Sequence, residues 1–79
     1  MKLVIYSLKG VEFSGEAASF NVKTTSGEIT VLDHHRPLVT ILESGTAKIG
    51  LTDQSVKNFE IKSGFLEMDH KNNLSVLVD

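Results

Sequence analysis

Apolar and polar residues alternate along most of this chain with a period of two. The apolar positions of four such segments are Ala18, Phe20 and Val22; Ala47, Ile49 and Leu51; Phe59 and Ile61; and Leu74, Val76 and Val78. Because successive side chains of a β-strand point to opposite faces, this pattern predicts strands with one buried and one solvated face. No apolar stripe at helical spacing continues over more than ten residues, so we expect no long helix.

Three further segments, 3–6, 38–42 and, more weakly, 29–32, carry apolar residues on both faces. We expect such strands to be covered on both faces, by a second sheet on one side and by a loop or a partner on the other. Turn signals such as Ser26-Gly27 and Asn72-Asn73 separate the segments. The sequence therefore predicts one all-β domain over residues 1–79, a two-layer antiparallel β-sandwich or flattened barrel of about 8–10 short strands with hairpins between neighbours.

Composition narrows the possible functions. The chain has 79 residues and no cysteine, which excludes disulfides, thiolate metal sites and a cysteine nucleophile. Eight basic and ten acidic residues give a net charge of -2, so there is no electrostatic reason to expect nucleic acid or an anionic membrane surface as a partner. The longest apolar run, 3–6, is far too short to span a bilayer, and no N-terminal targeting peptide is expected.

Side chains that carry out chemistry are present but scattered. His34 and His35 are adjacent, and in an extended chain they point to opposite faces, so they are poorly placed to share one metal ion. The serines lack a nucleophile-elbow pattern, the glycines lack phosphate-loop spacing, and the carboxylates are dispersed. We therefore predict no metal site, no cofactor and no catalytic residue, and a small hydrolase using His34 or His35 with an acid stays open as a minor alternative.

The segment 27–42 is the most distinctive part of the chain. A short strand, 29–32, leads into the polar loop Asp33-His34-His35-Arg36-Pro37, and the doubly apolar segment 38–42 follows. A charged loop beside an apolar strand suits a docking surface, on which the loop contacts a polar partner and the strand buries apolar area. An ordinary hairpin in a thin core is an equally good interpretation of the residues alone.

The order of short motifs along the chain resembles the N-terminal β-sandwich domain of the epsilon subunit of rotary F-type ATP synthases. The residues in register with that family are Gly27, Glu28, Ile29, Val31, His35, Pro37, Leu38 and Thr40; Phe13-Ser14-Gly15; Ser63-Gly64-Phe65-Leu66-Glu67-Met68; and Asn72 to Asp79. The resemblance covers essentially the whole chain. The departures from the family pattern, at Thr30, Asp33-His34 and Arg36, lie in or beside the loop that the family uses for docking.

The resemblance implies a non-catalytic rotor subunit of the central stalk, which clamps the gamma subunit to the ring of membrane c subunits and couples proton or other ion flow to ATP synthesis. It implies c-ring contacts by Ser26, Gly27 and Glu28, and gamma-subunit contacts by His35, Pro37, Leu38, Thr40 and Leu42. The membrane is then reached only through the c-ring.

The same resemblance implies a location on the cytoplasmic face of the bacterial inner membrane, with the plastid thylakoid less favoured. Family members commonly continue into a C-terminal helical hairpin, so the chain is expected to be a short form without that inhibitory element. A stand-alone β-sandwich adaptor or ligand-binding module is the main alternative function.

Overall fold

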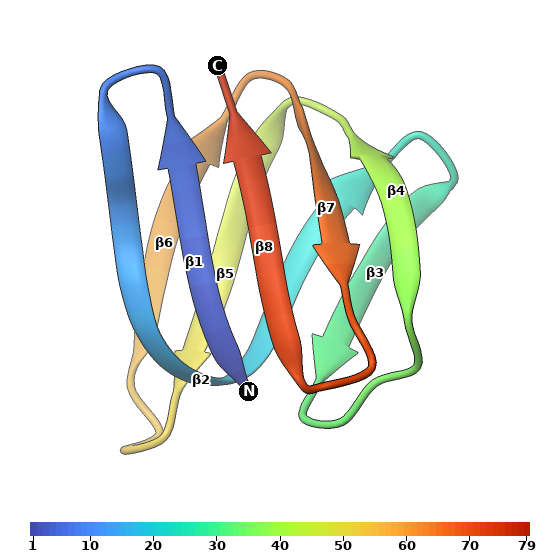
Figure 1. Cartoon of the computed structure of the whole chain (residues 1–79). Helices are drawn as coiled ribbons and strands as arrows, with labels where there is room; N and C mark the ends of the chain where they lie inside the picture. The colour runs from blue at the N-terminus through green and yellow to red at the C-terminus, as the bar shows by residue number, and fades with distance from the viewer.

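The computed structural model describes all 79 residues and contains eight β-strands and no helix (Figure 1). The strands are β1 (Lys2–Ser7), β2 (Gly10–Thr24), β3 (Gly27–Leu32), β4 (Leu38–Leu42), β5 (Gly45–Leu51), β6 (Val56–Ile61), β7 (Gly64–Met68) and β8 (Asn73–Val78). The predicted all-β sandwich of about 8–10 short strands is confirmed, with eight strands, although β2 is unexpectedly long at 15 residues. The structure contains no helix that is long and apolar enough to cross a membrane.

Strand β2 belongs to both layers of the sandwich and joins them. Its first part pairs with β1, where Glu16 lies opposite Lys2, and its second part lies between β3 and β5. In Figure 1 it descends on the left from the β1–β2 turn, turns under the molecule and rises behind. The front layer thus holds β4, β7, β8, β1 and the first part of β2, and the back layer holds β3, the rest of β2, β5 and β6.

A β-bulge lies where β2 passes between the layers. The register of β2 against β5 shifts between Ala17, which faces Leu51, and Ser19, which faces Gly50. Two residues of β2 therefore oppose one residue of β5, and the alternation of its side chains is interrupted. Ala17 is buried and Ala18 is exposed, so the prediction that Ala18 shares the inward face of Phe20 is wrong.

The strand pairings correct two details of the predicted topology. Strands β1 and β8 are parallel, with Leu3 opposite Leu74, whereas only antiparallel pairs were predicted. These strands stand at the two ends of the chain, so no short turn dictates their relative direction. Hairpins do join β1 to β2, β2 to β3, β5 to β6 and β7 to β8, but β4 pairs with β7, because the connections on either side of it cross between layers.

The core lies between the two layers and is almost entirely aliphatic. Phe20 is its one fully buried aromatic side chain, and the branched side chains around it include Leu3, Ile5, Ile49 and Leu66. These residues come from β1, β2, β5 and β7, so both layers contribute inward-facing positions. Removing their surface from water supplies most of the stabilisation that a chain with few aromatics and no disulfide has available.

Candidate functional site

The predicted c-ring contacts Ser26, Gly27 and Glu28 lie together at the tip of the β2–β3 hairpin (Figure 1), and all three are exposed. Gly27 has a φ of 114°, a conformation that side-chain-bearing residues rarely adopt. The Thr24 hydroxyl fixes the turn, since it donates to the carbonyl oxygen of Gly27 at 2.6 Å and accepts from the amide of Ser26 at 3.1 Å. The tip is thus an ordered corner from which the Glu28 carboxylate faces solvent.

The β3–β4 loop, residues 33–37, lies at the opposite end of β3 from this tip. It carries two of the predicted gamma-subunit contacts, His35 and Pro37, and both are exposed. Strand β3, six residues long, runs from the tip to the loop over about 20 Å. His35 and Pro37 therefore lie at the opposite end of β3 from Ser26, Gly27 and Glu28, whereas the last predicted gamma-subunit contact, Leu42, pairs with Thr24 beside the tip.

The Asp33 carboxylate anchors the start of the β3–β4 loop. Its Oδ1 lies 2.5 Å from the α-nitrogen of Met1 and accepts a hydrogen bond from Asn72 Nδ2 at 2.8 Å. These two hydrogen bonds, that from the α-ammonium group first, lower the pKa of Asp33. Met1 is only 6% exposed, so its α-ammonium group has little contact with water. The Asp33 carboxylate therefore balances a positive charge that solvent screens poorly.

Strand β4 turns its predicted contact residues toward the core. Leu38 and Thr40 are half-buried, and Leu42 is a core residue at 3% exposure. The prediction that Leu42 contacts the gamma subunit is therefore corrected for its side chain, because almost none of that side chain's surface is accessible to a partner. The residues that β4 presents outward are Val39 and Ile41, which are 67% and 61% exposed. Sequence reasoning did not select them, since both faces of this strand are apolar.

Ile41 is one end of a continuous apolar band across the outer face of the front layer. In the strand register, Tyr6 of β1 lies opposite Leu77 of β8, Leu77 opposite Phe65 of β7, and Phe65 opposite Ile41 of β4. All four are exposed, by 39% at Tyr6, 48% at Leu77, 44% at Phe65 and 61% at Ile41. We call these four residues the apolar row. A hollow of about 140 Å³, lined in part by Tyr6, Phe65 and Leu77, adjoins it.

The apolar row bears on one expectation about the doubly apolar strands. Segments 3–6 and 38–42 were expected to be covered by a second sheet on one face and by a loop or a partner on the other. No loop of this chain covers Tyr6 of β1 or Val39 and Ile41 of β4, so a covering partner stays a prediction. The row also adjoins the tip of the β2–β3 hairpin, because the amide of Thr25 donates to the carbonyl oxygen of Ile41 at 3.0 Å. One end of the sandwich thus presents an apolar surface and, next to it, the exposed carboxylate of Glu28.

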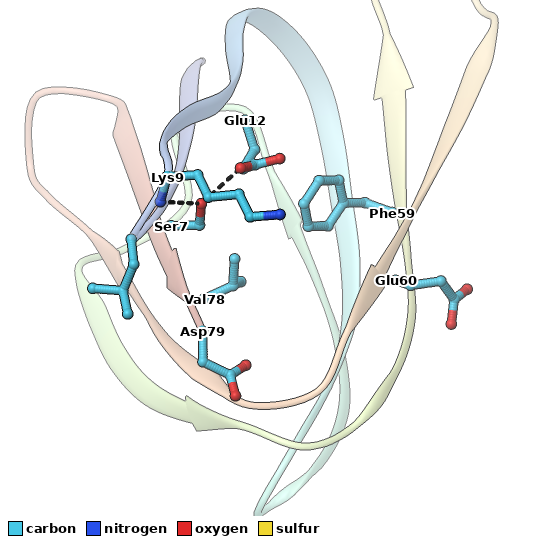
Figure 2. A pocket seen from close by; sticks show the side chains of 8 residues that line it. Ser7, Lys9, Glu12, Phe59, Glu60, Val78 and Asp79 are labelled. Carbon is cyan, nitrogen blue, oxygen red and sulfur yellow. Dashed lines mark hydrogen bonds between the residues drawn. The ribbon is translucent and has the colours of Figure 1, made fainter.

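A second concave region lies at the end of the sandwich where β1 and β8 finish. It is a groove of about 390 Å³ between the β1–β2 turn, β6 and the end of β8 (Figure 2). The Ser7 hydroxyl donates to Glu12 Oε2 at 2.6 Å and accepts from the amide of Lys9 at 3.1 Å. No histidine lines the groove, since His34 and His35 lie in the β3–β4 loop and His70 in the β7–β8 turn. The geometry therefore pairs this serine with a carboxylate and offers it no histidine base.

The histidines of the β3–β4 loop are likewise not arranged for chemistry. His34 Nε2 lies 3.8 Å from Asp33 Oδ2 on an exposed loop, and His35 Nδ1 contacts the carbonyl oxygen of Arg36 at 2.8 Å. No three histidine, aspartate or glutamate side chains are placed to hold one metal ion. The surfaces that the fold does build, the apolar row and the hairpin tip, are suited to contact with other proteins.

Comparison with known proteins places this chain. The family model of the ATP synthase delta/epsilon chain β-sandwich domain matches residues 1–79. The ATP synthase epsilon chain of Sulfurimonas denitrificans is 39% identical over 71 residues, which are 90% of this chain and 55% of the relative. That of Chlorobium limicola is 34% identical over 67 residues, which are 85% of this chain and 76% of the relative. The chain thus spans between about half and three quarters of the length of these two relatives.

Solved structures show the same fold. A chain of the Euglena gracilis mitochondrial ATP synthase matches with a TM-score of 0.90 at 19% identity, over 96% of this chain and 48% of that chain. A chain of the Tetrahymena thermophila mitochondrial ATP synthase, in a structure of its central stalk and c-ring, matches with a TM-score of 0.85 at 14% identity, over 99% of this chain and 62% of that chain. With the family match over residues 1–79, this chain belongs to the family of ATP synthase delta/epsilon chain β-sandwich domains.

Proposed function

We propose that this chain is a non-catalytic subunit of the central stalk of an F-type ATP synthase, where it clamps the gamma subunit to the c-ring and couples ion flow to ATP synthesis. Its family membership over residues 1–79 is the starting point. The observation that carries the proposal is the apolar row, because four large exposed apolar side chains at consecutive cross-strand positions are typical of a protein interface.

The apolar row and the outward side chain of Val39 form the proposed gamma-subunit contact. Val39 lies opposite Glu67 on β7 and extends the apolar area along β4. A few anchor residues near the centre of a protein interface, aromatic ones prominent among them, supply most of its binding energy, and Phe65 stands near the centre of the row. His35 and Pro37 extend this contact at the far end of β4, on the loop that precedes it.

The tip of the β2–β3 hairpin forms the proposed c-ring contact, through Ser26, Gly27 and Glu28. An exposed carboxylate beside an ordered turn suits a polar rim contact with basic groups in the loops of c subunits, worth about 0–1 kcal/mol for an exposed pair. The tip adjoins Ile41 through the hydrogen bond from Thr25. One rigid body therefore meets both partners at neighbouring surfaces, as a clamp between a shaft and a ring requires.

Several further properties belong to this proposal. The chain sits on the cytoplasmic face of a bacterial inner membrane and reaches the membrane only through the c-ring. It needs no cofactor or metal of its own. A stand-alone adaptor with the same fold is not favoured, because the bacterial relatives of this chain are ATP synthase epsilon chains.

Co-purification tests the proposal. The chain is expressed with the gamma subunit of the same organism, and we expect a stable complex with low-micromolar or tighter affinity. The matched variants are Phe65→Ser in the apolar row and Val56→Ser on β6 of the other layer, where Val56 is also exposed, at 64%. Retention of the complex by Val56→Ser but not by Phe65→Ser supports the assignment. A wild-type chain that fails to bind the gamma subunit overturns it.

A further inference from the structure

Asn72 joins two loops that are far apart in the sequence. It lies in the turn between β7 and β8 and has a φ of 66°. Its Nδ2 donates to Asp33 Oδ1 at 2.8 Å, and its Oδ1 accepts from the amide of His34 at 2.7 Å. Its own carbonyl oxygen accepts from the amide of Lys2 at 3.1 Å. One side chain thus binds two successive residues of the β3–β4 loop, from a turn that the β1 backbone holds in place.

The β3–β4 loop has few other attachments. Its hydrogen bonds to the rest of the chain end on Asn72 or on the α-nitrogen of Met1, apart from the bond from the amide of His35 to the carbonyl oxygen of Leu32. His34 adopts a φ of 61°, a left-handed conformation that costs free energy for this residue type unless its surroundings hold it. The hydrogen bond from the His34 amide to Asn72 Oδ1 helps to hold the His34 backbone in this left-handed conformation.

The residues that follow this anchor are the ones exposed to a partner. His35, Arg36 and Pro37 are all exposed, and they lie between the anchored Asp33-His34 pair and β4. A loop that must be ordered upon binding loses affinity by the cost of ordering it, whereas a loop already fixed in the free protein does not. Whatever fixes Asp33 and His34 therefore sets how well the exposed part of the loop is organised before docking.

We propose that Asn72 is a positioning residue for docking, whose side-chain amide holds the β3–β4 loop in the conformation in which His35 and Arg36 meet the gamma subunit. This inference rests on the proposed function. Asn72 itself acts through the loop, by two hydrogen bonds to Asp33 and His34.

The first test follows the free loop and needs no partner. Asn72→Gly removes the amide but retains a residue that tolerates the positive φ, so the β7–β8 turn is preserved. We expect amide hydrogen exchange at His34 to accelerate in Asn72→Gly, while exchange at the core residues Leu66 and Val76 is unchanged. Asn72→Asp serves as a second variant, because its carboxylate still accepts from His34 but repels Asp33. Unchanged exchange at His34 in both variants overturns the inference.

The second test measures docking as a double-mutant cycle. We expect Asn72→Gly to weaken binding of the gamma subunit about five- to tenfold, as the loss of two hydrogen bonds that organise a loop predicts. Because Asn72 acts through the loop, its effect and that of His35→Ala should be strongly non-additive, whereas its effect and that of Phe65→Ser should add. Additivity with His35→Ala contradicts the inference. A wild-type chain that does not bind at all overturns the proposed function instead, and the exchange experiment still decides the role of Asn72.

Discussion

Phe65 and Leu77 lie directly opposite one another on the antiparallel strands β7 and β8, and each is nearly half exposed, at 44% and 48%. Tyr6 and Ile41 extend this pair on either side to form the apolar row. Exposed apolar side chains are common when they are scattered, but contiguous ones mark interaction surfaces. The pair therefore forms the centre of the proposed gamma-subunit contact, and changes there should affect binding more than folding.

Substitution of Phe65 by serine should weaken gamma-subunit binding at least tenfold, or by about 1.4 kcal/mol, because the variant loses the central aromatic anchor of the contact. Urea unfolding should show a loss of about 1 kcal/mol, because somewhat more than half of the side chain is buried, and the affinity is measured where the variant is still folded. Calorimetric titration of the gamma subunit measures the affinity. Val56→Ser, which removes an exposed apolar side chain from β6 (64% exposed, against 44% for Phe65), should bind like the wild type. Equal losses for both variants would argue against a localised contact.

Reversal of the charge at the β2–β3 tip should impair coupling. Glu28 is exposed and accepts one hydrogen bond, from Asn21 Nδ2 at 3.1 Å, so Glu28→Lys should shift the unfolding free energy by no more than about 0.5 kcal/mol. If the carboxylate meets basic groups of the c-ring, the new ammonium group repels them. ATP-driven proton pumping in vesicles that carry the variant should then fall. The control is Glu43→Lys, an exposed site between β4 and β5, and pumping that is equally active with both variants refutes the c-ring assignment.

The alternation of residues was enough to predict the strands and most of the core. Phe20, Val22, Ile49 and Val76 all face inward as their period of two predicts. The bulge at Ala17 was not predictable, because two adjacent alanines give no preference for which of them is buried. Where a strand carries apolar residues on both faces, as β4 does, the pattern carries no information about which face is outward.

The apolar row could not be predicted from the sequence either. Tyr6, Ile41, Phe65 and Leu77 are far apart along the chain, and only the cross-strand register brings them into one line. The parallel pairing of β1 with β8 is part of that register, and no local turn encodes it. The family resemblance predicted partner contacts on β4 and on the tip of the β2–β3 hairpin. Only the burial of each residue in the structure shows which side chains of β4 a partner can reach.

Acid should destabilise the chain in part through Asp33. Hydrogen bonds from the Met1 α-ammonium group and from Asn72 hold the pKa of this carboxyl below its usual 3.8. A carboxyl whose pKa is depressed in the folded state stabilises the fold above the unfolded pKa, and that contribution is lost as the pH falls through the folded pKa. Asp33→Asn should therefore be less stable than the wild type at neutral pH, and the difference should shrink as the pH falls below about 4.

Urea unfolding measured from pH 7 to pH 2 tests this convergence. The pKa of Asp53 is also lowered, chiefly by the hydrogen bond from the Ser55 side chain, so Asp53→Asn is the matched control. The Asp53→Asn variant should lose the acid dependence that comes from Asp53 and keep the one that comes from Asp33. The reason is that the side-chain hydrogen bonds of Asp53 come from Ser55, and Met1 and Asn72 do not contribute to lowering its pKa. A constant gap between wild type and Asp33→Asn at every pH would contradict the proposed ion pair.

Gly64 makes room for the strand pairing on which the apolar row depends. A Cβ atom at this position would lie 2.0 Å from the carbonyl oxygen of Leu77 and 3.1 Å from the Cα of Val78, and both are backbone atoms that cannot move aside without breaking the β7–β8 ladder. Gly64→Ala should therefore destabilise the fold by about 1–3 kcal/mol. It should also weaken gamma-subunit binding, because Phe65 and Leu77 would shift with their strands.

Gly15→Ala is the control for this substitution. A Cβ atom there would meet only the Phe13 ring at 3.6 Å, an ordinary contact distance, so the unfolding free energy should change by no more than about 0.5 kcal/mol. Urea unfolding of both variants, read alongside gamma-subunit titration, separates packing from docking. If Gly64→Ala unfolds like Gly15→Ala, the close approach of β7 to β8 at this point is not a constraint on the fold.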